Sequence, residues 1–159
     1  MKRLFPVLLL VFSLDALAAG KFSQVKTAPA QKPENAVEFA AADGWTITGE
    51  YYPAKDGELY TVVLLHSLKG KKEEWGRFSQ VLRDNGYGVL AVDFRGYGTS
   101  INGVDGSTAS WKNFQRTGTN NEFNQMVWDV EAGLSFLTSR NVPETKIVLM
   151  GAGLGANVA

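Results

Sequence analysis

Three runs dominated by apolar residues constrain the fold of this chain more than any other feature of its sequence. They occupy residues 60–65 (YTVVLL), 88–92 (GVLAV) and 146–150 (KIVLM). A strand that reads as a continuous apolar run is typically covered on both faces, as in the interior of a parallel sheet. Because helical patterns separate the runs, right-handed crossovers are expected to connect them, and the sequence predicts a mostly parallel α/β sheet.

The first crossover is predicted to contain a helix that begins near Glu73. The apolar residues Trp75, Phe78 and Leu82 recur there at helical spacing. Asn85-Gly86 follows, and a glycine after asparagine is typical of the left-handed residue just past a helix end. The helix should therefore end near residue 85.

A second helix is predicted after a long polar connection at 99–121. Thr119 and Glu122 have the spacing of a capping box, in which the two side chains bond each other's backbone N–H groups. Pro143 prevents the helix from continuing. One helical face is expected to carry the apolar side chains of Phe123, Met126, Val127, Val130, Leu134 and Leu137.

An antiparallel strand pair is predicted ahead of the first apolar run. Apolar and polar residues alternate at 37–41 and again at 45–51, and Asp43-Gly44 between them is a typical hairpin turn. The folded domain is therefore expected to span residues 37–159.

The first 18 residues have the pattern of a secretory signal peptide. A basic start at 1–3 precedes an uncharged apolar stretch at 4–14 and a small-x-small cleavage site at 16–18. The apolar stretch is shorter than the roughly 20 residues that span a bilayer. We therefore expect a periplasmic or secreted protein with no membrane span after cleavage, in which residues 19–36 form a flexible leader.

Charge and composition exclude some classes of partner. Sixteen basic residues balance sixteen acidic ones, which argues against a nucleic-acid-binding surface. The chain has no cysteine, so its stability after export would come from its core rather than from disulfides. The sequence predicts no metal and no cofactor.

The glycine-rich turn after the third run is consistent with two kinds of site. Gly151, Gly153 and Ala156 fit the G-x-G-x-x-G/A pattern of a dinucleotide-binding turn, although that turn normally follows the first strand of its sheet. Residues 151–155 (GAGLG) also fit a nucleophile elbow, G-x-S-x-G, at every position except the serine.

Two upstream loops favour the elbow. His66-Ser67-Leu68-Lys69-Gly70 follows the first run, and D-x-R-G-x-G-x-S at 93–100 follows the second. Together with the elbow, they resemble in order and spacing the motifs of the α/β-hydrolase family, which includes serine esterases and serine aminopeptidases. The resemblance covers Val37 to Ala159, about the N-terminal half of such a domain. It implies a mostly parallel sheet with an antiparallel N-terminal strand pair, truncated after the elbow strand.

The resemblance also assigns roles to individual residues. Gly153 stands at the nucleophile position, and the backbone N–H groups of Leu154 and Leu68 would form the oxyanion hole. Ser67 occupies a position where the family usually has glycine. Asp93 and Arg95 are expected to act as a turn-fixing pair and not as catalytic residues.

The resemblance further implies that this chain lacks a complete catalytic triad. Acyl transfer needs a nucleophile, a histidine base and a carboxylate that orients the base. Gly153 has no side chain, and the only histidine, His66, lies in the oxyanion loop, where we expect it to pack and not to act as the base. The family's base and acid follow the elbow in chain order.

We therefore predict an exported member of a family that hydrolyses small-molecule esters or amides, inactive as this chain. The alternative is a non-catalytic module on the same fold that binds a ligand or a partner, with Trp111 and Phe114 as contact residues. A minor alternative is dinucleotide binding at 151–155. An exposed strand at 146–150 would also favour self-association.

Overall fold

The computed structural model describes residues 33–57 and 59–159. The predicted signal peptide and the leader as far as residue 32 lie outside the described residues. Within the part that is described, no helix combines the length and the apolar character needed to cross a membrane.

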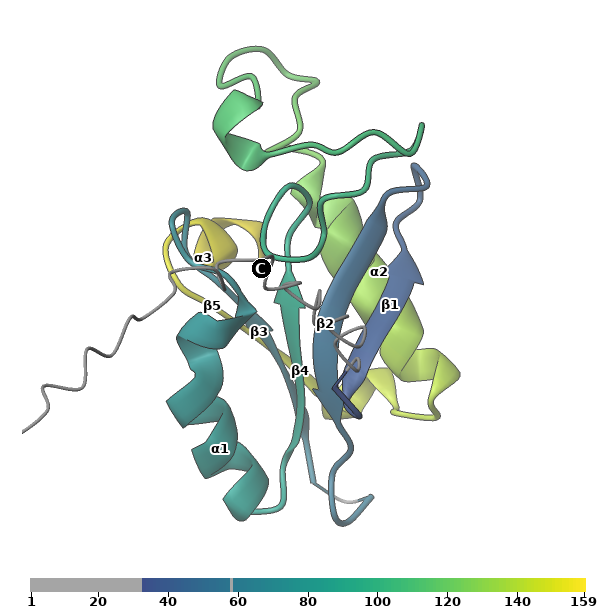
Figure 1. Cartoon of the computed structure of the whole chain (residues 1–159). Helices are drawn as coiled ribbons and strands as arrows, with labels where there is room; N and C mark the ends of the chain where they lie inside the picture. Colours follow the sequence, from purple (N-terminus) through teal and green to yellow (C-terminus); the bar gives the residue numbers. More distant parts are fainter. Residues whose placement is uncertain (1–32, 58) are drawn as a thin grey trace, which may run out of the picture. The chain divides into compact units, whose positions relative to one another are not determined.

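The described residues form a five-stranded sheet in the order β1-β2-β4-β3-β5 (Figure 1). β1 pairs antiparallel with β2, and β2 antiparallel with β4, whereas β3 runs parallel to both β4 and β5. The predicted α/β class, with an antiparallel pair at the start, is confirmed. The strands are β1 (Ala36–Ala40), β2 (Thr46–Tyr52), β3 (Thr61–Leu65), β4 (Gly88–Asp93) and β5 (Ile147–Gly151).

Helices cover the two faces of β3 and β4, every residue of which is buried. On one face, Trp75 and Leu82 pack beside the core residues Val62, Leu64, Val89 and Ala91. On the other face, α2 packs against the alternate residues of the same strands. Figure 1 shows α1 and α2 on opposite sides of the sheet. The helical elements are η1 (Lys72–Trp75), α1 (Gly76–Asp84), η2 (Trp111–Asn113), α2 (Met126–Ser139), η3 (Glu144–Lys146) and α3 (Leu154–Val158).

The first predicted helix is largely confirmed, with one error on its apolar face. The chain turns helical at η1 and continues into α1, which ends at the cap residue Asn85, and Gly86 has a positive φ of 86°. Phe78, however, is 37% exposed. Its side chain therefore does not reach the core that Leu82 helps to form.

The predicted start of the second helix is wrong. α2 begins at Met126, and no side chain caps it. The Glu122 carboxylate accepts a hydrogen bond from the Gln115 N–H (3.3 Å), while Asn121 Oδ1 accepts from the Asn124 N–H (3.0 Å). These local bonds hold residues 121–125 as a turn, which displaces the helix start by several residues from the predicted capping box.

The predicted apolar face of α2 contains one exposed residue. Met126, Val130 and Leu137 are buried as expected, but Val127 is 42% exposed. Val127 follows the fully buried Met126 in the first turn of α2, and its side chain lines a hollow at the surface instead of the core.

β5 lies at one end of the sheet and, among the described strands, pairs only with β3. Ile147 and Leu149 pack toward the core that α2 covers. Val148 and Met150 project to the other face and are 39% and 36% exposed. The predicted self-association would involve the unpaired edge of β5 and these two side chains. That association stays a prediction.

Candidate active site

The strand-to-helix turn after β5 has the backbone geometry of a sharp elbow. Gly153 is the residue before α3 and adopts φ 51° and ψ −109°. A positive φ of this kind is unfavourable for residues with a Cβ and is routine for glycine. Gly153 is also exposed, so the apex of the turn faces solvent.

The three glycines of this turn meet different surroundings. A Cβ on Gly151 would overlap the backbone of Gly155, and a Cβ on Gly155 would overlap the carbonyl group of Leu65. A Cβ on Gly153 would have Ser67 Cβ as its nearest neighbour, at 3.7 Å. Close packing therefore requires glycine at 151 and 155, whereas position 153 has room for a side chain.

The elbow is anchored to the end of β3. The Ala152 N–H donates to the Leu65 carbonyl (3.0 Å), and the Gly155 N–H donates to the His66 carbonyl (3.2 Å). Both bonds place the apex beside the loop 66–70. Within the described part of the chain, the N–H groups of Leu154 and Leu68 donate to no protein group. These are the two donors that the sequence assigns to an oxyanion hole.

The loop 66–70 is held by bonds to its own backbone and to neighbouring side chains. The Ser67 carbonyl accepts from the Gly70 N–H (3.0 Å), and the Ser67 N–H donates to Glu74 Oε2 (2.8 Å). The Tyr97 hydroxyl donates to the Leu68 carbonyl (2.9 Å). The position of the Leu68 amide is thus set from both sides of the loop.

His66 is fully buried beneath this loop, and both of its ring nitrogens are engaged. Nε2 accepts from the Phe94 N–H (3.2 Å), which fixes the proton on Nδ1, and Nδ1 then donates to the Ser67 carbonyl (2.7 Å). Burial lowers the pKa of the ring. In this tautomer His66 shapes the loop and has no free nitrogen with which to accept a proton.

The His66 ring is expected to stay neutral below pH 6.5. Since its folded pKa lies under the unfolded value of about 6.5, its contribution to stability is complete above that pH and is lost as the pH falls below it. NMR can follow the only histidine of the chain directly. The expected result is a titration midpoint below that of the urea-unfolded chain, with ¹⁵N shifts of the Nδ1–H tautomer. A midpoint at or above the unfolded value would contradict the burial.

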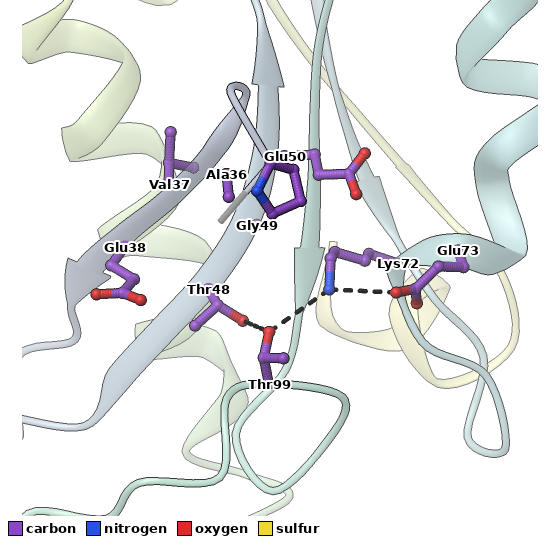
Figure 2. Close-up of a pocket in the computed structure, with 10 residues that line it drawn as sticks. Ala36, Val37, Glu38, Thr48, Gly49, Glu50, Lys72, Glu73 and Thr99 are labelled. Atoms are coloured by element: carbon purple, nitrogen blue, oxygen red, sulfur yellow. Dashed lines mark hydrogen bonds and ion pairs between the residues drawn. The ribbon is translucent and has the colours of Figure 1, made fainter. Parts of the chain in front are cut away.

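Asp93 fixes the loop 93–100, but it does not pair with Arg95. The buried Asp93 carboxylate accepts from the backbone N–H (2.8 Å) and Nζ (2.7 Å) of Lys72, and from the Thr99 N–H (3.2 Å). Figure 2 shows Lys72 between Thr99 and Glu73. Asp93 and Arg95 each fix a turn as predicted, but each does so with partners of its own. The sequence did not predict Lys72 as the partner of Asp93.

Arg95 instead pairs with two carboxylates that the sequence did not indicate as partners. Its Nε and Nη2 lie 2.9 and 2.7 Å from Asp129 Oδ1, and its Nη1 lies 2.6 Å from Asp43 Oδ2. Both Arg95 and Asp129 are fully buried. Burial raises the pKa of Asp129 to about 6, and the Arg95 guanidinium opposes that rise. The place of Asp129 on the apolar face of α2 is a sequence signal that this carboxylate is buried, but it does not identify Arg95 as the partner.

The aromatic residues of the long connection pack inward. Phe114 is buried and meets the Trp45 ring edge-on, at 6.1 Å between centroids. Trp111 stacks on Tyr97 at 5.2 Å with an interplanar angle of 1°. Phe114 therefore cannot serve as the contact residue that the alternative prediction required, and Trp111 supports the tyrosine that holds Leu68.

Three hollows are lined by residues of the elbow or of the loop 66–70. One of them, of about 510 Å³, is lined by Ala152 and by residues of η1 and α1. The other two share lining residues. One, of about 240 Å³, is lined partly by Leu68, and the other, of about 370 Å³, is lined partly by Leu154. Phe123 and Asn124 line both. The pocket in Figure 2, of about 320 Å³, is a separate feature, since none of its lining residues belongs to the elbow or to the loop 66–70.

A family model described as serine aminopeptidase, S33, matches residues 59–159. The chain belongs to this α/β-hydrolase family. The match includes the loops at 66–70 and 93–100 and the elbow. No curated protein matches the chain.

Solved structures of α/β-hydrolases share the fold of this family member. The esterase Pf2001 of Pyrococcus furiosus is 25% identical with a TM-score of 0.56, over 78% of this chain and 44% of the esterase. The esterase EaEST of Exiguobacterium antarcticum is 21% identical with a TM-score of 0.55 (77% and 37%), and GrgF of Penicillium sp. sh18 is 20% identical with a TM-score of 0.59 (77% and 38%). The chain thus spans less than half the length of each structure.

Proposed function

We propose that this α/β-hydrolase-family chain is an exported protein that does not by itself turn over the esters or amides typical of serine hydrolases. The observation that carries the proposal is the elbow at Gly153. Gly153 has a φ of 51° and lies exposed at the apex of the turn, yet this position, where an attacking group would stand, has no side chain.

The chemistry of acyl transfer supports the same conclusion. A serine nucleophile needs a histidine within hydrogen-bond reach to take its proton, and a third group to orient that histidine. His66 is the only histidine in these 159 residues, and its ring nitrogens bond Phe94 and Ser67. Loss of the nucleophile alone typically lowers turnover about a millionfold.

A binding function on the same fold is the second candidate. It is favoured by the two hollows that Leu68 and Leu154 help to line. It is also favoured by the backbone N–H groups of these two residues, which donate to no group of the described chain. Under this proposal the site holds a small molecule without turnover. Dinucleotide binding at 151–155 is disfavoured. Gly151 packs against the backbone of Gly155, and Gly155 packs against Leu65, so neither glycine faces open space where a pyrophosphate could approach.

Gly153→Ser is expected to restore the hydroxyl without restoring catalysis. The space beside Ser67 accommodates a side chain at 153, but both ring nitrogens of His66, the only histidine of the sequence, are bonded to other groups. We expect both the parent chain and the variant to hydrolyse p-nitrophenyl acetate no faster than an unfolded control. A fluorophosphonate probe, read by intact-protein mass spectrometry, should leave both unlabelled.

Labelling would contradict the proposal in an informative way. Modification at residue 153 of the variant would mean that another group acts as the base. Modification of the parent chain at Ser67 would mean that this hydroxyl replaces the missing nucleophile. A Ser67→Ala variant separates the two outcomes, because it removes only the second.

Export is proposed from the sequence of residues 1–18 alone. The test is to express the full chain in a bacterium and to determine the N-terminal residue of the exported protein. We expect cleavage after Ala18, so that the mature chain starts at Ala19. A full-length chain retained inside the cell would overturn this part of the proposal.

A further inference from the structure

Arg116 is an exposed cation with no ion pair and no hydrogen bond among the described residues. Glu122, the acidic residue next along this connection, instead accepts from the Gln115 N–H. Burial raises the pKa of Tyr97 to about 12, and the nearby Arg116 charge opposes that rise. The Tyr97 hydroxyl in turn holds the Leu68 carbonyl.

Among the described residues that line the two hollows sharing Phe123 and Asn124, Arg116 is the only charged one. It lines the smaller hollow with Leu68, Asn121, Phe123 and Asn124. The larger hollow shares Phe123 and Asn124 with it and is lined further by the apolar side chains of Val127, Leu154 and Val158 and by the Asn157 amide. One side of this combined site therefore carries a cation and the other three apolar side chains, and none of its described lining residues is a carboxylate.

We propose that the combined site binds an amphipathic carboxylic acid or a half-ester that carries a free carboxylate. The carboxylate would pair with the Arg116 guanidinium, whose planar fork matches the two oxygens of such a group. The apolar part would lie against Phe123, Val127 and Leu154 and be removed from water. The inference rests on the proposed function only in taking these hollows as the ligand site.

The test compares two probes of equal chain length, hexanoate and 1-hexanol, against the ¹⁵N-labelled full chain at pH 7.5. NMR titration should shift the Leu68, Asn124 and Leu154 amides with both probes. Because an exposed charge pair contributes modestly, hexanoate is expected to bind about twofold to fivefold more tightly than hexanol. Added salt should weaken only the hexanoate interaction.

Arg116→Gln is the decisive variant, and Arg77→Gln is its matched control. Arg77 is likewise exposed, but it lines the hollow between α1 and Ala152, which shares no lining residue with the combined site. Arg116→Gln should abolish the preference for hexanoate and leave hexanol binding unchanged, whereas Arg77→Gln should leave both unchanged. Both arginines lie at the surface, so both variants are expected to fold.

Three results would overturn the inference. These are equal affinity for the two probes, a preference that survives in Arg116→Gln, and the absence of binding by either probe at millimolar concentration. Turnover of p-nitrophenyl acetate by the parent chain would overturn the proposed function instead. It would leave the preference for a carboxylate standing, so the two failures are distinguishable.

Discussion

Asp129→Asn is expected to lower the free energy of unfolding by about 3–5 kcal/mol, because it leaves the buried Arg95 charge with one carboxylate in place of two. Asp129 accepts from Nε and Nη2 of Arg95 and from its backbone N–H (2.9 Å). Neither side chain of this pair is accessible to solvent. Without the charge of Asp129, the guanidinium would remain desolvated in the core and only partly compensated.

The measurement is urea denaturation at pH 7.5, above the Asp129 pKa of about 6, so that the parent carboxylate is ionised. Glu131→Gln is the matched control, since Glu131 is exposed on the same helix, and it should change stability by less than about 0.5 kcal/mol. Asp43→Asn should fall between them, because the Asp43 side chain is 23% exposed. An Asp129→Asn chain as stable as the control would show that Asp43 alone neutralises Arg95.

Two buried groups, His66 and Asp129, should change the free energy of unfolding with pH in opposite directions. The contribution of His66 is lost as the pH falls below about 6.5. The raised pKa of Asp129 acts the other way, since the folded state then binds more protons, and its contribution declines as the pH rises from about 4 to about 6. The two slopes partly cancel, which is why the His66 ring is better followed by NMR than by denaturation.

The sequence predicted β3 and β4 well because both strands are buried on both faces. Continuous apolar runs such as 61–65 leave few alternatives, and the asparagine-glycine stop after α1 depends on residues adjacent in the chain. The same holds for the elbow, where the glycine pattern is local. Features set by neighbouring residues could thus be read directly from the sequence.

The errors arose where a side chain bonds a partner outside the short motif from which its role was predicted. Glu122 was expected to cap α2, but it bonds the Gln115 N–H, which the sequence gives no reason to place nearby. Arg95 and Asp129 are 34 positions apart, and nothing in the local pattern pairs them. The order of strands was needed before these side chains could be assigned to the same buried cluster.

Gly155→Ala is expected to destabilise the chain by about 3 kcal/mol or more, which exceeds the expected cost of Gly153→Ala. A methyl group at 155 would overlap the Leu65 carbonyl group, and backbone atoms of a central strand cannot move aside cheaply. A backbone shift that relieved the overlap would weaken the bond from the residue 155 N–H to the His66 carbonyl (3.2 Å). Urea denaturation at pH 7.5 measures the loss.

Comparison of three glycines separates packing from backbone strain. The added methyl group of Gly153→Ala would overlap no neighbouring atom. Its cost should therefore be the backbone strain of a positive φ alone, about 1–2 kcal/mol. Gly76→Ala, in α1 with a helical φ and open surroundings, should be neutral or stabilising by up to about 1 kcal/mol. If Gly153→Ala proved as damaging as Gly155→Ala, position 153 would be closely packed. It would then not be an open place for a side chain, and the assignment of Gly153 to the nucleophile position would lose its physical basis.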